Sequence, residues 1–177
     1  MTVSEPNTSS TPVAPPAATP FEHAVSRLRA TRLAASSKPF VARGANAQRC
    51  PHCRLATHLC ICALRPQVPT HAGVCLLMGD IETLKPSNTG WLIADVVPDT
   101  WAFQWSRTEV EPALLALLSD PQWAPCVVFP PEYAKPGRAV AEVLPPAPGD
   151  VTGKRPLFIL LDGTWSEARK MFRKSPY

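Results

Sequence analysis

Short apolar runs alternate with longer and more polar segments along most of the chain. "HAGVCLLMG" (71–79) predicts a buried strand that ends at Gly79. "WAFQWSRT" (101–108) alternates as a strand with one apolar face does. "PCVVFP" (125–130) and "PLFILLD" (156–162) predict two further short strands.

Helical spacing lies between and around these runs. Residues 21–33 favour a short helix with a weak apolar side, and 112–120 favours a helix that Asp120-Pro121 ends. A helix or strand begins near Thr89, and 166–174 predicts a final helix. Strands that alternate with helices indicate an α/β domain with a mostly parallel sheet.

Proline and charge are distributed unevenly over the 177 residues, 22 of which are proline. Residues 1–20 are Pro, Ser, Thr and Ala without apolar periodicity, which predicts disorder. Residues 1–49 carry six Lys/Arg against two acids, and six minus two equals the +4 of the whole chain. This basic segment is either a solvated tail or an arm that follows a nucleic-acid backbone.

These patterns divide the chain into a disordered, basic and Pro-rich tail that can include a short helix (1–45), a cysteine-rich knuckle (46–66) and an α/β domain (67–177). No apolar run approaches the roughly 18 residues of a membrane-spanning helix. The N-terminus has no basic region followed by an apolar one, so a secretory signal is not expected. We therefore expect a cytoplasmic protein with no membrane partner. Nothing in the sequence indicates a protein partner.

The string "CPHCRLATHLCIC" places Cys50, Cys53, Cys60 and Cys62 within a short stretch. Four thiolates at this spacing can surround one tetrahedral Zn²⁺, with two ligands from each arm, as in structural zinc sites. His52 and His58 are spare ligands. Two disulfides or a redox pair are the alternatives, which a reducing cytosol and the absence of a flanking βαβ pattern disfavour.

"LFILLDGTWSEARK" places Asp162 at the end of the last predicted strand. Open α/β sheets bind ligands beyond the carboxyl ends of their strands. Thr164 or Ser166 can cap the following helix, and Trp165 offers a flat surface for a base. The residues are equally consistent with a plain strand-to-helix turn that has a capping Asp and a core Trp.

Four motifs resemble, in order, those of the DTW-domain tRNA-uridine aminocarboxypropyltransferases. They are "CPHCRLATHLCIC", "MGDIETLKPSNTGWLI", "VVFPPEYA" and "LDGTWSEARKM". The string Asp99-Thr100-Trp101 is not the family signature, because it lacks the intervening residue. Gly79 and Trp91 stand where family members commonly have His and Arg.

The resemblance implies a SPOUT-like fold whose C-terminal part is knotted and completes the cofactor site. Relatives continue beyond the position of Tyr177, so we expect this chain to be truncated, with weak donor binding and little turnover. It also implies an enzyme that transfers the 3-amino-3-carboxypropyl group of S-adenosylmethionine to N3 of a tRNA uridine, with release of 5′-methylthioadenosine. The tRNA and S-adenosylmethionine are then the partners, and the zinc is structural.

The same resemblance assigns roles residue by residue. Asp162, Thr164 and Trp165 are the catalytic candidates, with Asp162 as the base that accepts or orients the N3 proton. The candidates for donor binding are Asn88, Thr89, Gly90, Glu132, Leu161 and Gly163. The candidates for tRNA phosphates are Arg169, Lys170, Arg173 and Lys174.

Roles without ligand binding are the alternatives for these groups: a helix N-cap at 88–90, a solvated loop acid at Glu132 and a solvated face on the last helix. A non-catalytic zinc-knuckle RNA-binding protein and an RNA methyltransferase that uses the same donor are the alternative functions.

Overall fold

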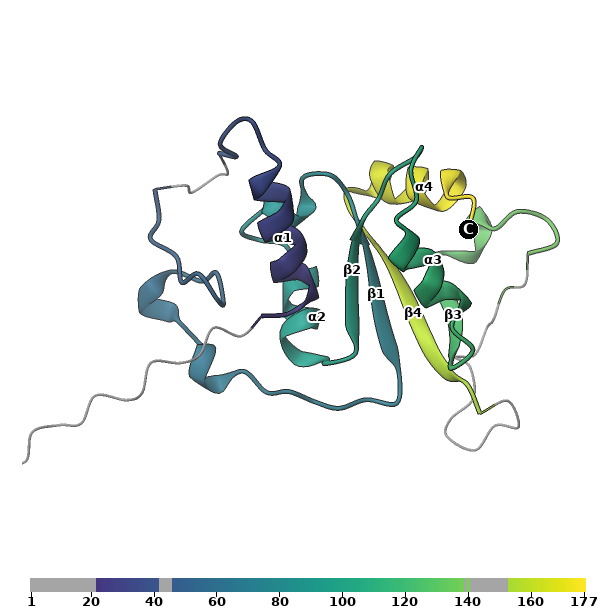
Figure 1. Cartoon of the computed structure of the whole chain (residues 1–177), viewed down its shortest axis with the longest axis horizontal. Coiled ribbons are helices and arrows are strands. Elements are labelled where there is room, and N and C mark those ends of the chain that lie inside the picture. Colours follow the sequence, from purple (N-terminus) through teal and green to yellow (C-terminus); the bar gives the residue numbers. More distant parts are fainter. Residues whose placement is uncertain (1–21, 42–45, 139, 141–152) are drawn as a thin grey trace, which may run out of the picture.

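The structure, a computed structural model, describes residues 22–41, 46–138, 140 and 153–177. The predicted disorder of residues 1–20 therefore lies outside the described residues, as does the first part of the basic tail. The elements follow the predicted alternation of strands and helices (Figure 1). Short 3-10 turns, which the sequence pattern does not indicate, lie between them: Thr57–Leu59, Cys62–Leu64, Glu82–Leu84 and Pro131–Tyr133.

The described strands form one four-stranded parallel sheet with the order β2-β1-β4-β3. They are β1 (Gly73–Met78), β2 (Thr100–Gln104), β3 (Trp123–Val128) and β4 (Arg155–Asp162). The prediction of an α/β fold with a mostly parallel sheet is confirmed. Because all strands run the same way, their carboxyl ends meet at one edge, where Met78 of β1 pairs with Asp162 of β4. The SPOUT-like arrangement and the knot stay predictions.

Helices cover both faces of this sheet. α1 (Ala24–Ala34) and α2 (Gly90–Val96) lie on one side, and α3 (Pro112–Ser119) lies on the other (Figure 1). α4 (Trp165–Lys174) follows β4 and lies at the edge where the strands end. The element near Thr89 is thus a helix, and the helices expected at 112–120 and 166–174 are present.

Alternation along β1 explains why its sequence is apolar throughout. Cys75 and Leu77 are buried against α3, whereas Leu76 and Met78 are buried against α1 and α2. A strand covered on both faces has no solvent side, so every position is apolar. Full burial of such a side chain contributes about 1.5–3 kcal/mol. β4 follows the same rule, which sends Leu161 and Asp162 to opposite faces.

The short helix expected within the tail packs against the sheet. Val25 of α1 is fully buried in the cluster formed with Leu76 and Trp91. His23 caps α1 by accepting a hydrogen bond from the Ser26 amide at its Nδ1. α1 therefore belongs to the α/β unit, although it lies in the segment assigned to the tail.

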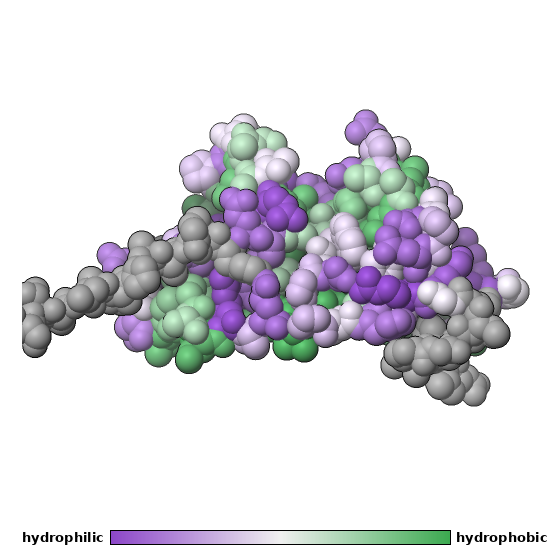
Figure 2. Space-filling model, turned by 60° about the horizontal axis from the view of Figure 1, so that its bottom comes forward, coloured by the Kyte–Doolittle hydropathy of each residue, from purple (hydrophilic) through white to green (hydrophobic). Residues whose placement is uncertain are grey.

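The face in Figure 2 is largely hydrophilic, with separate hydrophobic areas and no continuous apolar band. Among the described residues, no helix is both long enough and apolar enough to cross a bilayer.

Candidate active site and metal centre

The sulfur atoms of Cys50, Cys53, Cys60 and Cys62 converge, all within 4.8 Å of one another. The distance from Cys50 Sγ is 3.5 Å to Cys62 Sγ and 3.6 Å to Cys60 Sγ, and Cys53 Sγ lies 3.8 Å from Cys60 Sγ. A regular tetrahedron with Zn–S bonds of about 2.3 Å has sulfur–sulfur edges of about 3.8 Å. All four are free thiols, so they form no disulfide. The cluster therefore fits one zinc ion, and neither His52 nor His58 belongs to it.

The chain around the cluster is folded as a turn that exposes N–H groups to sulfur. Burial raises the pKa of the Cys50 thiol, but hydrogen bonds from the backbone N–H groups of Cys53 and His52 and from the Cys62 and Cys60 side chains together outweigh it and bring this pKa to about 6. Burial, reinforced by hydrogen bonds with its neighbours, raises the pKa of Cys62 to about 12. Without metal the Cys62 thiol therefore keeps its proton at neutral pH, and a bound cation would replace that proton.

The cysteine knuckle is fastened to the α/β domain by Arg54, whose backbone is left-handed at φ 62°. The Arg54 guanidinium is buried and donates to the carbonyl oxygens of Leu84 and Lys85. It also lies 4.6 Å over the ring of Trp91. Trp91 Nε1 in turn donates to the His52 carbonyl at 3.0 Å. Knuckle and domain are therefore joined at the segment that leads into α2.

Asp162 is half-buried at the carboxyl end of β4 and faces that same segment. Its Oδ2 accepts a hydrogen bond of 2.8 Å from Asn88 Nδ2. Asn88 Oδ1 accepts from the Trp91 amide at 3.1 Å, so Asn88, which precedes the N-cap residue Thr89, both satisfies an N–H of the first turn of α2 and contacts Asp162. A Cβ atom at Gly90 would lie 2.7 Å from Asp162 Oδ2, so glycine is required for this approach. Two motifs that are distant in the sequence thus meet at one carboxylate.

The environment of Asp162 disfavours its charged form. Burial raises the pKa of the Asp162 carboxyl, and the negative charge of Glu82 raises it further. The Asn88 hydrogen bond and the Lys85 charge act in the opposite direction without cancelling the effect. Glu82 is itself buried and forms an ion pair with Lys85. Our sequence reasoning missed Glu82 and Lys85, although both lie within the quoted "GDIETLKPSNTG" segment.

Thr164, and not Asp162, caps α4. Thr164 Oγ1 accepts from the Glu167 amide at 3.3 Å, and the Glu167 carboxylate accepts from the Thr164 amide at 2.9 Å. This reciprocal pair is a capping box. Of the two hydroxyls predicted as caps, Thr164 is the cap and Ser166 is not, and the alternative of a capping Asp is wrong. Trp165 is 53% exposed, so the alternative of a core tryptophan is wrong as well.

The remaining donor-binding candidates are not gathered at Asp162. Thr89 is exposed at the N-cap of α2, and its side chain makes no capping hydrogen bond. Glu132 is exposed on the 3-10 turn that follows β3. Gly163 forms the turn between β4 and α4, next to Glu167. Leu161 lies on the opposite sheet face from Asp162.

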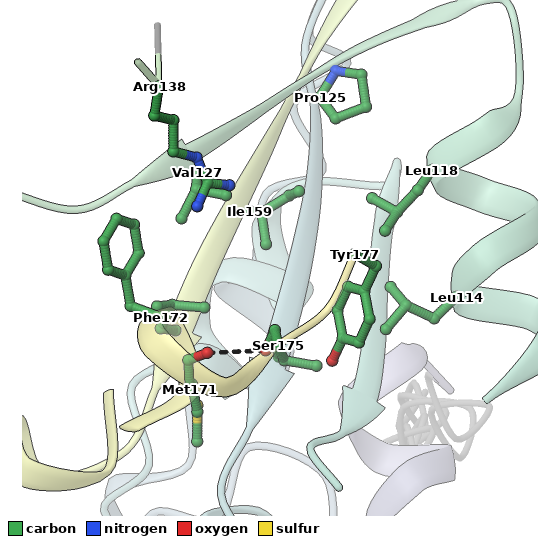
Figure 3. Close-up of a pocket in the computed structure, with 12 residues that line it drawn as sticks. Leu114, Leu118, Pro125, Val127, Arg138, Ile159, Met171, Phe172, Ser175 and Tyr177 are labelled. Atoms are coloured by element: carbon green, nitrogen blue, oxygen red, sulfur yellow. Dashed lines mark hydrogen bonds between the residues drawn. The ribbon is translucent and has the colours of Figure 1, made fainter. Parts of the chain in front are cut away.

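Leu161 lines a pocket of about 290 Å³. The pocket lies between α3, β4 and α4 (Figure 3). Its walls are mostly apolar, with Leu114 and Leu118 of α3 on one side and Phe172 of α4 on the other. Arg138 supplies a guanidinium at its margin (Figure 3). The pocket therefore suits a small ligand with apolar and anionic parts.

The four cationic candidates lie together. Arg169, Lys170, Arg173 and Lys174 line one groove of about 340 Å³ with Ser166. These residues recur every three or four positions, so they occupy one side of α4.

The structure thus defines an α/β protein whose parallel sheet carries, at its carboxyl edge, a four-cysteine knuckle that can hold a metal ion. The chain belongs to the DTW domain family, whose sequence model matches residues 47–177. No solved structure matches the chain. Membership of this family is consistent with a tRNA-modifying enzyme.

Proposed function

We propose that this protein is a tRNA-uridine aminocarboxypropyltransferase that forms 3-(3-amino-3-carboxypropyl)uridine. The observation that carries the proposal is the contact between Asp162 and Asn88, which joins two family motifs at a half-buried carboxyl. A carboxyl with no structural task at the helix start, at the ligand-binding edge of a parallel sheet, is typical of a functional site.

Asp162 is the proposed general base. A carboxylate with an ordinary pKa of about 3.9 is a weak base for the uridine N3 proton. Burial raises the pKa of Asp162, which brings it closer to the working pH and so favours proton transfer. Asn88 fixes the orientation of the carboxylate by donating to Oδ2, which leaves Oδ1 for the N3–H group.

S-adenosylmethionine, when bound, supplies the 3-amino-3-carboxypropyl group on a sulfonium leaving group. The residues of the chain then have to position the uridine and remove its N3 proton. N3 forms a bond to the γ-carbon, the bond from that carbon to sulfur breaks with its electron pair on sulfur, and the proton passes to Asp162. The chain from Asn88 to Gly90 is the proposed site for the carboxylate part of the donor, because it lies on the same side of the sheet as Asp162.

The proposed role of the zinc ion is structural, so the ion neither contacts the substrate nor takes part in the reaction. Four cysteine ligands leave no open coordination site for a substrate. His52 and Arg54 of the knuckle contact Trp91 and the chain before Asn88, so a folded knuckle supports the loop that orients Asp162. The tRNA is proposed to meet the basic side of α4.

Substitution Asp162→Asn in the complete, zinc-loaded gene product tests the proposal. We expect single-turnover formation of methylthioadenosine with tRNA to fall by roughly 10²–10⁴-fold, because the base is lost while the shape is kept. Asp120→Asn, on the turn after α3, is the matched control. Normal turnover by the Asp162 variant at normal stability would refute the assignment. S-adenosylhomocysteine as the product would instead indicate a methyltransferase, and bound RNA without either product a non-catalytic binding protein.

A further inference from the structure

Trp165 is the exposed end of a stack of aromatic rings. Its ring lies 5.4 Å from that of Phe129 at an interplanar angle of 12°, and Phe129 lies 4.4 Å from Phe172 at 17°. Tyr133 contacts Phe129 and Trp165 edge-on, at 5.4 and 5.7 Å. An indole supported on one face and 53% exposed is held rigidly with surface left for another flat group.

The surface of α4 is divided into three stripes by the helical period. Ala168 and Met171 are buried against the domain. Trp165 and Phe172 come next around the helix and form the aromatic stripe. The groove lined by Ser166, Arg169, Lys170, Arg173 and Lys174 forms the third stripe. The aromatic stripe and the cationic groove therefore share one border along the helix.

Two arginine guanidinium groups lie over aromatic rings at this border. The Arg169 guanidinium lies 5.2 Å over the ring of Tyr133, and its buried Nε has no hydrogen-bond partner in the described part of the chain. Arg138 lies 5.3 Å over the ring of Phe172. The groove lining holds no carboxylate among the described residues. A ligand that fits both stripes has a flat face on one side and negative charges along the other.

An unpaired nucleotide strand has this chemistry. Its bases stack on aromatic rings, and its phosphates follow a cationic groove. A base within a duplex has no free face, so a helix of RNA would meet only the cations. An acidic peptide would also meet the cations but would leave the indole face without a flat partner.

We infer that Trp165 stacks an unpaired RNA base that flanks the modified uridine, while the groove along α4 holds the adjoining phosphates. This deepens the proposed function and rests on it. Asp162 faces α2 and Asn88, whereas Trp165 stacks on Phe129, which follows the neighbouring strand β3. The two side chains therefore serve different nucleotides, and the substrate is a single-stranded or opened segment of RNA.

The test measures binding of the complete protein to a uridine-rich single-stranded RNA and to the same sequence annealed to its complement. Trp165→Ala should weaken binding of the single strand by about 5- to 150-fold, which is the range for loss of one stacked base. Trp165→Phe should retain most of the affinity, because a ring remains. Leu92→Ala, which removes an equally exposed apolar side chain (54%) from α2, is the control.

Salt dependence separates the two stripes. Trp165→Ala should leave the salt slope unchanged, whereas Arg173→Gln should lower it, because only the latter removes a phosphate contact. Equal affinity of wild type and Trp165→Ala for the single strand would overturn the inference, as would equal affinity of wild type for the duplex. Tighter binding of polyglutamate than of RNA would indicate a protein partner and overturn it too. Failure of the transferase proposal is a separate result, namely no methylthioadenosine despite stacking-dependent RNA binding.

Discussion

Asn88 Nδ2 donates a 2.8 Å hydrogen bond to Asp162 Oδ2 across 74 residues of sequence. The other end of the same amide, Asn88 Oδ1, accepts from the Trp91 backbone. One side chain therefore fixes both the start of α2 and the orientation of the carboxyl at the end of β4. A shift of α2 would therefore move the Asn88 amide that donates a hydrogen bond to Asp162.

Substitution Asn88→Ala should shift the pH dependence of the reaction upward. The Asn88 hydrogen bond holds the pKa of Asp162 below the value that burial alone would set. Its removal raises that pKa, so the limb of the pH–rate profile that reports the deprotonated base should move to higher pH. Loss of a hydrogen bond to a charged group costs about 1.5–3 kcal/mol. At pH values below the raised pKa of the base, this cost corresponds to a rate that is roughly 10- to 150-fold lower than that of the wild type.

The measurement is the pH profile of single-turnover methylthioadenosine formation. Asn46→Ala, at an exposed asparagine, is the matched control and should leave the profile unchanged. A uniform loss of rate with an unmoved limb would mean that Asn88 acts only at the start of α2.

The cysteine cluster should hold one zinc ion per chain. Cys53→Ser should abolish stoichiometric zinc and lower the melting temperature, since structural zinc sites contribute roughly 10–16 kcal/mol to folding of the peptide around them. Metal analysis and thermal unfolding of protein purified without added zinc measure both effects. Cys126→Ala, at a half-buried thiol on β3, should retain the metal. A fully folded, metal-free wild type would contradict the zinc assignment.

Arg54 should matter for stability without binding metal. Its guanidinium donates to the carbonyls of Leu84 and Lys85 and lies over Trp91, and lysine cannot make this set of contacts. Arg54→Lys should therefore cost about 1–3 kcal/mol in the free energy of unfolding, while zinc stays bound. Arg27→Lys, at an exposed arginine of α1, is the control. Zinc loss in the Arg54 variant would indicate that the residue shapes the cluster and not the docking.

The elements and the cysteine cluster could be predicted because both depend on local pattern. β1 is apolar throughout and β4 is apolar from Pro156 to Leu161, which is typical of strands with two covered faces. The spacing of the four cysteines alone predicts a set of ligands that can surround one ion. The strand order could not be predicted. Insertion of β4 between β1 and β3 depends on packing between segments far apart in the chain.

For the same reason, the sequence predicted some residues of the site but not the contacts between them. Asp162 and Asn88 stood out as parts of motifs, but their contact requires the register of β1 with β4. Glu82 was missed because a lone acid in a loop resembles any solvated residue, and only its burial next to Asp162 distinguishes it. Trp165 was ambiguous because an apolar residue after a strand is as often in the core as exposed.

Replacement of Asp162 should stabilise the protein at neutral pH. Its folded-state pKa is raised, so the folded state binds the proton more readily than the unfolded state does. Stability is therefore lost as the pH rises from the unfolded value, about 3.9, through the raised folded value. Each pH unit between the two corresponds to about 1.4 kcal/mol. Asn cannot ionise and can still accept a hydrogen bond from Asn88. The melting temperature of Asp162→Asn should therefore be higher than that of the wild type at pH 7, and the two should be equal below a pH of about 4.

The control residue for this prediction, Asp120, has a pKa that is shifted in the opposite direction. Hydrogen bonds from Gln122 lower the pKa of Asp120, so that carboxylate favours folding above its ordinary pKa. Asp120→Asn should therefore give no gain at pH 7. Thermal unfolding of both variants across this pH range is the measurement. If Asp162→Asn instead melts below wild type at pH 7 and not in acid, the carboxylate is stabilised by its surroundings. In that case it is too weak a base for the role proposed for it, because a group that the fold prefers ionised has a low affinity for the N3 proton.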